Sequence, residues 1–460
     1  MVAGSPGTDW SATRASDKVN SPPIGPRPTY VRYMVLAAIA LASSSAYLTR
    51  YCISIANTTI EAELGLTPSD MGLVFTAFNV GYLVFQVPGG ALGNRFGTRV
   101  SMPLLSSLWS LFTVWTSLAF SFIPLIASRI AFGCAQAGLV PNSAKIINDW
   151  LPLSRRGFGS ATIGAAMSVG SVITFGLTAK LLEYLDWRTV FQLYSLVGIA
   201  WAGGYYWFAR SHPSEHKWVN DAELSLIAGE AVDTDADSKT NGEKNGLTWA
   251  RLNVMARSMS MWGICVQSFF RAAGYIILVT WFPAFLEKGF GVTREEAGLL
   301  SMAPTAGVIV GTMAGGFIVD WLLRLTGSKR ISRSGVAMAA LGLCSFVTLS
   351  ASWTGSPYQL VGAVTVGAVF SGGGNPAAWA ATMDVAGKLT AEVMGIMNMA
   401  GTLGGLITPT VLGYMIENIE RTNGDWNTVI YLSAAIYLAG SLSWLAVDPN
   451  VTVDGTRASA

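Results

Sequence analysis

LTPSDMGL, residues 66–73, recurs 226 residues later as VTREEAGL, residues 292–299. GGALGNRFGTR (89–99) recurs at the same offset as GGFIVDWLLRLTGSKR (315–330). Two separate matches at one offset are hard to obtain by chance, so the chain holds two copies of one unit. In each copy a Thr precedes an acid by three residues, Thr67 with Asp70 and Thr293 with Glu296, a spacing that predicts a capping box at a helix start.

The composition places these two copies in a membrane. Of 460 residues 51% are hydrophobic and 12% are charged, against about 25% charged residues in soluble domains. The net charge of +2 does not gather on one basic face, so no nucleic-acid partner is expected. The four cysteines lack metal-ligand spacing, and the apolar runs hold no Ser–His–acid set or His cluster. We therefore expect no metal, no cofactor and no enzyme activity.

Long apolar runs predict twelve spanning helices, since a membrane span needs about 20 mostly apolar residues. They cover residues 33–57, 69–92, 100–120, 122–149, 157–181, 189–209, 258–286, 295–323, 334–353, 357–383, 390–417 and 424–446. With the repeat, they predict an all-α membrane protein of two six-helix halves. Parallel six-helix repeats about an axis along the membrane normal are the architecture of major facilitator transporters, and the chain resembles that superfamily.

The polar segments divide the chain into five regions. We expect a disordered tail at 1–30, a six-helix bundle at 31–209, a largely flexible linker at 210–256, a second bundle at 257–447 and a tail at 448–460. Lys and Arg gather in the N-terminal tail, the even-numbered gaps, the linker and the C-terminal tail. By the positive-inside rule both termini are cytoplasmic. A monomer in the plasma (inner) membrane is expected.

The loop between the second and third spans carries a candidate gate. In the superfamily an acid usually precedes its first arginine, and here that position is Asn94, followed by Arg95 and Arg99. The second-half copy keeps an acid, Asp320. These residues can latch one conformation, or they can form a tight turn with positive-inside arginines; both readings are compatible.

Three arginines fall well inside expected spans: Arg50, Arg129 and Arg271. An ionisable residue at membrane depth is costly and indicates a functional site unless its side chain reaches an interface. None of the twelve runs has an acid at its centre. A guanidinium without a carboxylate partner suits an anionic ligand, so we expect these arginines to bind an anionic substrate.

Several motifs resemble the anion:cation symporter family, which contains sugar-acid transporters, sialin, vesicular glutamate transporters and plant phosphate transporters. They are YLTR (47–50), GYLVFQVPGG (81–90), SRIAFGCAQAGLVPNSAKIINDWLPLSRRGFGSA (128–161), DWRTVFQLYS (186–195), LVTWFPAFL (278–286) and the segments NPAAWAATMD (375–384) and IMNMAGTLGGLITP (396–409). The resemblance extends from Tyr33 to about Val447 and identifies the family, not a substrate.

The resemblance implies roles for individual residues. Arg50 and Arg129 match arginines associated with the anionic substrate or its coupling network, and Tyr82 matches a cavity tyrosine. Arg271 matches an arginine of the vesicular glutamate transporters. Trp379 and Asn398 match cavity positions, although helix packing and an interhelical hydrogen bond explain them equally well.

The chain departs from the family at two positions of its proton-coupled members. The aspartate of YLDR is Thr49 here, and a glutamate in the fourth span is Gln136, which we include among the substrate-site residues. Neither side chain titrates, so the usual proton carriers are missing.

The resulting hypothesis is a secondary transporter of a small organic anion, a sugar acid or related carboxylate, working by alternating access. It could be a uniporter or exchanger, or it could be coupled to Na⁺, to H⁺ or to a proton on the substrate. A phosphate or organophosphate carrier is the alternative substrate class. A membrane sensor that has kept the fold and lost transport is the alternative functional class.

Overall fold

The computed structural model describes residues 27–229 and 249–453, and these residues are almost entirely helical. The first half holds α1 (Val31–Ile55), α2 (Asn57–Leu64), α3 (Pro68–Phe96), α4 (Thr98–Ser117), α5 (Phe122–Gln136), α6 (Leu139–Trp150), α7 (Leu153–Leu181) and α8 (Trp187–Phe208). The second half holds α12 (Met259–Thr280), α13 (Phe282–Phe290), α14 (Arg294–Thr326), α15 (Val336–Ser350), α16 (Pro357–Ala386), α17 (Thr390–Thr422) and α18 (Asn427–Leu442).

Each of the twelve expected spans coincides with one helix or with two consecutive helices. Within the described ranges, nine helical stretches are long and apolar enough to cross a membrane. The remaining three expected spans are filled by α4, α8 and α16, of 20, 22 and 30 residues. The prediction of an all-helical membrane protein is confirmed.

Both repeat copies open their helix as the capping pattern predicts. Thr67 and Asp70 form a complete capping box at the start of α3. Thr293 Oγ1 accepts a hydrogen bond from Glu296 N at 3.3 Å at the start of α14. The carboxylate of Glu296 turns instead to the hydroxyl of Tyr358, at 2.5 Å, so the second box is only half formed.

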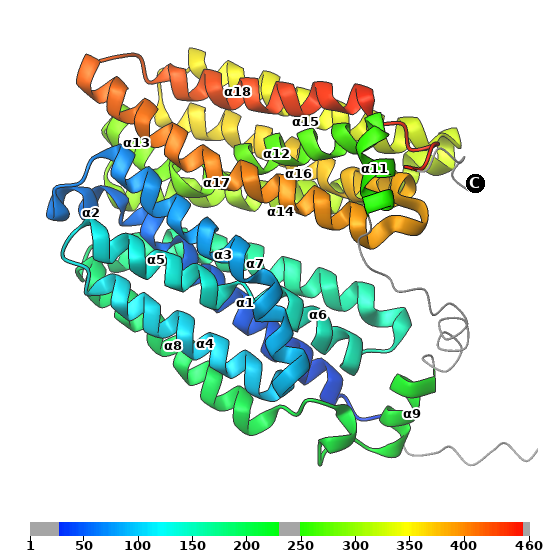
Figure 1. Cartoon of the computed structure of the whole chain (residues 1–460). Helices are drawn as coiled ribbons and strands as arrows, with labels where there is room; N and C mark the ends of the chain where they lie inside the picture. The colour runs from blue at the N-terminus through cyan, green and yellow to red at the C-terminus, as the bar shows by residue number, and fades with distance from the viewer. Residues whose placement is uncertain (1–26, 230–248, 454–460) are drawn as a thin grey trace, which may run out of the picture.

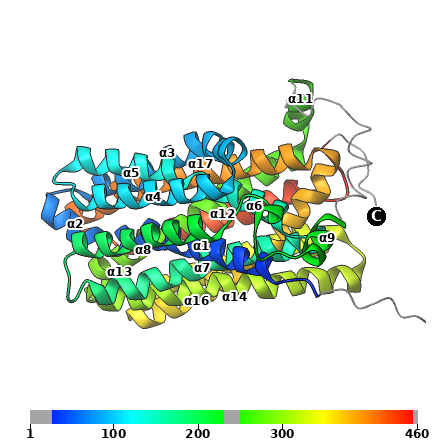
Figure 2. The ribbon, with the colours of Figure 1, turned by 90° about the horizontal axis from the view of Figure 1, so that it is seen from below.

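The two halves lie one above the other in Figure 1, with α2 and α13 at one end and α9 and α11 at the other. We call the end that carries α2 and α13 the distal end. We call the opposite end, where the described residues begin and end, the terminal end. Figure 2 shows the same arrangement from a second direction, with the long helices running between these two ends.

Close contacts between the halves lie toward the distal end. Thr76 Oγ1 in α3 donates to Leu406 O in α17 at 2.9 Å. A Cβ at Gly72 of α3 would lie 2.6 Å from Pro409 O in α17, a separation that side chains essentially never reach. The backbones of α3 and α17 therefore touch because this position is glycine. On the other side of the interface, Lys180 of α7 pairs with Glu295 of α14 at 3.0 Å.

Within the first half, α3 and α5 also pack backbone to backbone. A Cβ at Gly81 would lie 2.1 Å from Ile130 O, and a Cβ at Gly133 would lie 2.1 Å from Phe78 O. Small residues at helix crossings are a general means of tight packing in membranes. This crossing holds the Phe78 region of α3 against the part of α5 that carries Arg129.

The segment that follows α8 is partly ordered against the first half. It forms η1 (Pro213–Glu215) and α9 (Asp221–Gly229), and α11 (Trp249–Arg257) precedes the second half. Residues 230–248 of the expected linker, 1–26 of the N-terminal tail and 454–460 of the C-terminal tail lie outside the described residues. The expected flexibility of the linker therefore does not extend to residues 213–229, which fold as helical turns.

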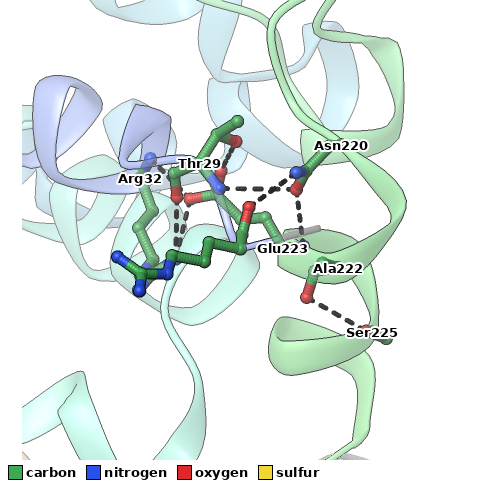
Figure 3. Close-up of polar contacts among 7 residues, drawn as sticks. Thr29, Arg32, Asn220, Ala222, Glu223 and Ser225 are labelled. Atoms are coloured by element: carbon green, nitrogen blue, oxygen red, sulfur yellow. Dashed lines mark hydrogen bonds and ion pairs between the residues drawn. The ribbon is translucent and has the colours of Figure 1, made fainter. Parts of the chain in front are cut away.

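A buried ion pair fastens this segment to the start of α1 (Figure 3). Arg32 Nη1 lies 2.9 Å from Glu223 Oε1, and the Glu223 side chain is fully buried. The backbone N–H of Arg32 and the hydroxyl of Thr29 also donate to this carboxylate. Asn220 Oδ1 accepts from Thr29 N at 3.3 Å and caps α9 at Glu223 N. The beginning of α9 is therefore tied to the first half.

This junction gives a test of the fold. Glu223→Gln should lower the thermal unfolding midpoint in detergent, because it leaves the buried Arg32 without its counter-charge, at a cost of about 3 kcal/mol. Glu215→Gln is the matched control, since the exposed Glu215 accepts only a long 3.5 Å bond from His212 N. Equal midpoints for the two variants would show that the ion pair does not hold the junction.

Candidate substrate site

Arg50 lies in α1 with its guanidinium held by an amide and by ring faces. Its Nε donates to Gln136 Oε1 of α5 at 2.6 Å. Its Cζ lies 4.5 Å from the ring centroid of Tyr47, 4.7 Å from that of Phe78 and 5.0 Å from that of Tyr82. Aromatic faces attract cations through their quadrupole, and this attraction offsets part of the cost of burial. Tyr82, expected in the cavity, is therefore a direct neighbour of Arg50.

Gln136 is fully buried and uses both ends of its amide. Its Oε1 accepts from Arg50, and its Nε2 donates to Ala46 O at 2.7 Å, one turn before Arg50 on α1. The amide therefore orients the guanidinium without neutralising it. A glutamate in this place would form an ion pair with Arg50. The fully buried Thr49 bonds to carbonyls of its own helix, with its Oγ1 3.0 Å from Ala46 O.

Arg129 in α5 is only 2% exposed and has a weaker set of contacts. Its Nη2 donates to Arg50 O at a long 3.4 Å, and its Cζ lies 4.5 Å from the ring centroid of Phe132. Its Nε is buried and finds no hydrogen-bond partner among the residues that the structure describes. A buried donor left without an acceptor is costly, so Arg129 retains capacity to bind an anion.

A small cavity of about 50 Å³ lies against these two arginines. The first half contributes Arg50, Arg129, Ser54 and Asn79 to its wall, and α12 of the second half contributes Ile276 and Thr280. Ser54 Oγ is buried without a partner. Asn79 Nδ2 donates to Gly405 O of α17 at 3.1 Å. The cavity therefore combines cationic and neutral polar groups at the boundary between the halves.

Arg271 of α12 supplies a cation from the second half. Its Nη1 donates to Asn375 Oδ1 of α16 at 2.8 Å, and Asn375 Nδ2 is 3.4 Å from Thr312 Oγ1 of α14. The Nε of Arg271 is buried and has no hydrogen-bond partner in the described ranges 27–229 and 249–453. Asn375 was not predicted as a site residue, although an Asn inside the apolar run GGGNPAAWA (372–380) is a visible signal.

None of the ion pairs in the described part of the chain includes Arg50, Arg129 or Arg271. All three are held by amides, carbonyls or rings. This agrees with the sequence observation that no acid lies at the centre of a span. The centre of the bundle therefore carries an excess of positive charge with hydrogen-bond donors still free.

Trp379 in α16 and Asn398 in α17 are both exposed, Trp379 to 51%. Among the described contacts neither touches the three arginines. Thr402 Oγ1 donates to the backbone carbonyl of Asn398 at 2.9 Å, and this leaves the Asn398 amide to other partners. Their expected place in a substrate cavity stays a prediction.

The candidate gate residues lie at the terminal end of the bundle. Asn94, Arg95 and Asp320 are exposed. Arg99 Nε donates to Tyr206 O of α8 at 3.3 Å. An acid outside the gate motif pairs with basic side chains at this end. Asp384 of α16 pairs with Arg333 at 3.1 Å and with Lys329 at 3.5 Å.

The chain is similar to known transporters along most of its length. It is 28% identical over 423 residues to a probable sulfoacetate transporter of Cupriavidus necator, covering 92% of this chain and 95% of the relative. It is also 28% identical to a probable galactarate/D-glucarate transporter of Escherichia coli, over 91% of this chain and 94% of that one.

Among solved structures, a bacterial homologue of the human lysosomal transporter Spinster, inward-facing and unoccupied, matches with a TM-score of 0.70. It shares 18% identity and covers 91% of this chain and 95% of its own, a likeness that shows the fold. The model of the Major Facilitator Superfamily matches residues 39–409 and 264–459. The helical bundle, its membrane-spanning segments and these matches agree, and the chain is an integral membrane protein that belongs to the Major Facilitator Superfamily.

Proposed function

We propose that the protein is a secondary transporter of a small organic anion, and that Arg50, Arg129 and Arg271 bind the anion. The observation that carries this proposal is the set of buried guanidinium groups that have no carboxylate partner among the described residues. Arg129 Nε and Arg271 Nε are buried donors without acceptors. Substrate carboxylate or sulfonate oxygens would supply the missing acceptors, because guanidinium groups form strong charge-assisted bonds with such anions.

Charge balance favours a substrate with more than one acidic or polar group. The first half offers Arg50 and Arg129, and the second half offers Arg271. An anion that contacts both halves would link their positions, as alternating access requires. The relatives are named for sulfoacetate and for galactarate or glucarate. Each of these compounds carries two acidic groups, so we include a sugar acid or related carboxylate as the substrate class.

The arrangement of the halves supports transport by alternating access. The halves touch along α3–α17 and α7–α14 toward the distal end. Trp379 and Met399 lie nearer the terminal end and are 51% and 59% exposed. We infer an inward-facing arrangement from these contacts, with both termini cytoplasmic as the positive-inside rule predicts. A monomer in the plasma membrane, of two bundles at 31–209 and 257–447, remains the simplest assembly.

The proposal does not include proton coupling through positions 49 and 136, where the proton-coupled relatives carry acids. Thr49 is bonded within its own helix, and Gln136 bridges Arg50 and Ala46 O. Neither side chain can carry a proton in transport. The anion gradient, Na⁺ or a proton carried on the substrate would then drive the cycle. Phosphate is the competing substrate, since arginine binds phosphate with the same geometry.

The first prediction concerns the substrate and the arginines. In proteoliposomes, saturable uptake should be seen for galactarate, glucarate or sulfoacetate, and uptake should not require an inward proton gradient. Arg50→Ala and Arg129→Ala should each raise the apparent KM by about 10- to 100-fold, because a charge-assisted hydrogen bond is lost.

Arg421→Ala is the control, because Arg421 is 74% exposed at the distal end of α17. Hexonates, hexuronates, glutamate and phosphate complete the panel. Selective uptake of phosphate would move the protein to the alternative substrate class. Saturable binding without uptake of any compound would favour a sensor over a carrier.

The second prediction concerns Gln136. Gln136→Glu should reduce uptake at pH 7.5, because the new carboxylate would sit at the present 2.6 Å contact with Arg50 and compete with the substrate as the partner of the guanidinium. Uptake relative to the unchanged protein should recover as the pH falls and this carboxylate is protonated. The control is Gln192→Glu, on an exposed face of α8. Unchanged uptake by Gln136→Glu at pH 7.5 would contradict the assigned role.

A further inference from the structure

A cluster of charged side chains joins the two halves at the distal end. We call Glu61, Glu287, Lys288, Arg294 and Glu420 the gate cluster. Lys288 Nζ lies 2.5 Å from Glu61 Oε2 and 2.9 Å from Glu420 Oε1. Arg294 Nε lies 3.9 Å from Glu287 Oε2.

The first half reaches this cluster through α2 alone. Glu61 is its charged member, and Thr58 Oγ1 donates to Glu287 Oε2 across the interface at 2.6 Å. The other four charged members belong to α13, α14 and α17 of the second half. The contacts of Glu61 and Thr58 therefore exist only while the distal end is closed.

Three side chains of the gate cluster are largely buried, whereas those of Arg294 and Glu420 are 33% and 36% exposed. The side chain of Glu61 is 9% exposed, that of Glu287 is 12% exposed and that of Lys288 is 18% exposed. With every group ionised, three carboxylates face two cations, which leaves one negative charge without compensation. Burial of uncompensated charge is costly, and a protein relieves it by binding or releasing a proton.

One carboxylate oxygen is placed to take such a proton. Glu61 Oε2 is bonded to Lys288, but Glu61 Oε1 is buried and has no hydrogen-bond partner within the described part of the chain. The amide of Asn57, one turn earlier on α2, is also buried without a partner and could accept a hydrogen bond from a protonated Glu61. A hollow of about 500 Å³, lined by Thr58, Glu61, Glu287 and Lys288, gives water access to the cluster.

The other charged groups at this end are engaged elsewhere. Glu63, two residues after Glu61, bonds to Arg188 and Trp187 of its own half. Asp70 caps α3. Glu417 accepts from Ser69 and pairs with Arg421. Lys180 pairs with Glu183 and Glu295 on the α7–α14 side. Charge balance around Glu61 is therefore set by the gate cluster.

We propose that the gate cluster takes up one proton, mainly on Glu61, when the distal end closes and releases it to the same side when that end opens. Acid on the distal side then holds the transporter closed at that side. The inference rests on the alternating-access function proposed above. The proton returns to the side from which it came, so the cluster regulates the cycle and does not drive it.

The direction follows from the change in burial. Burial raises the pKa of Glu61 above its usual value, and the attraction of Lys288 opposes this only in part. Burial likewise raises the pKa of Glu287, against the hydrogen bond from Thr58. Burial by itself would lower the pKa of Lys288, but Glu61 and Glu420 outweigh it and raise that pKa, so Lys288 stays charged.

In an open, hydrated gate a glutamate returns to a pKa of about 4.3. The closed state binds the proton more tightly, so it is favoured as the pH falls. This stabilisation is fully present below about pH 4.3 and is lost as the pH rises through the raised pKa of the closed state. Between high and low pH, the ratio of closed to open molecules changes by up to tenfold for each unit by which closure raises the pKa of the glutamate.

A simple salt-bridge latch predicts the opposite effect of pH, namely that acid opens the distal end. In that case, protonation of Glu61 would break its bond to Lys288 and open the gate. The two ideas are separated by Glu61→Gln, which mimics the protonated acid. Our proposal expects this variant to stay closed, because the remaining Glu287 and Glu420 balance Lys288 and Arg294. A latch expects it to open.

The experiment measures the distal end directly. Spin labels are attached at Tyr184→Cys and Thr422→Cys, two exposed distal positions in opposite halves. Pulsed electron paramagnetic resonance then measures the distance between the two labels between pH 4.5 and pH 8. Cys134 and Cys265, which are half-buried, are replaced by Ser, while the buried Cys52 and Cys344 are retained. The labelled chain without further change should show a severalfold gain of the short, closed distance on acidification.

Three variants decide the outcome. Glu61→Gln should show the closed distance at every pH, whereas Lys288→Gln, which increases the negative surplus, should shift the population toward open. The matched control Glu63→Gln should keep the normal pH response. Opening on acidification, opening of Glu61→Gln at pH 7.5, or a preserved pH response in Glu61→Gln would each overturn the proposal. The labels need no substrate, so a protein that moves no anion but still closes with acid would refute the transport proposal alone.

Discussion

The structure depends on how an apolar bundle accommodates charge. A guanidinium in the interior must find acceptors or ring faces, because water is excluded and an isolated charge is costly there. Arg50 finds the Gln136 amide and three aromatic rings, and Arg271 finds Asn375. These partners hold the cations in place and leave their charge intact. This retained positive charge is the basis on which an anionic substrate is proposed for the centre of the protein.

The distal end resolves the same difficulty in another way. There, Lys288 of the second half lies between Glu61 of the first half and Glu420 of its own half. The cluster as a whole keeps one carboxylate in excess of its cations. Such pairing ties the charge balance to the distance between the halves. At the centre, by contrast, Gln136 and Arg50 belong to the same half and can remain together as the halves move. In the proposed mechanism the contact between Gln136 and Arg50 prepares the binding site, and the contact between Glu61 and Lys288 responds to the separation of the halves.

Much of the architecture could be predicted from sequence because it follows from local patterns of residues. The twelve spans follow from apolar runs, the repeat from a single offset, and the cap at Thr67 from a spacing of three residues. The three inner arginines were visible for the same reason. Gln136 and Tyr82, which contact Arg50, were also named from the sequence. Asn375 was not, since its pairing with Arg271 depends on the packing of α12 against α16. Polar composition likewise did not reveal that Glu223 is fully buried, so residues 213–229 were interpreted as part of a flexible linker.

The pairing of Glu61 with Lys288 shows why gates are harder to infer than binding sites. Both residues lie in short polar gaps, 227 positions apart, where charged side chains are expected and attract no attention. Their role in closure depends on their burial, and only the closed arrangement of the halves buries them. A non-titrating Gln136 keeps the setting of Arg50 independent of pH, whereas Glu61 makes closure dependent on it. A single central acid would both hold the arginine and sense the proton. In this proposal the two tasks are divided between Gln136 of α5 and Glu61 of α2.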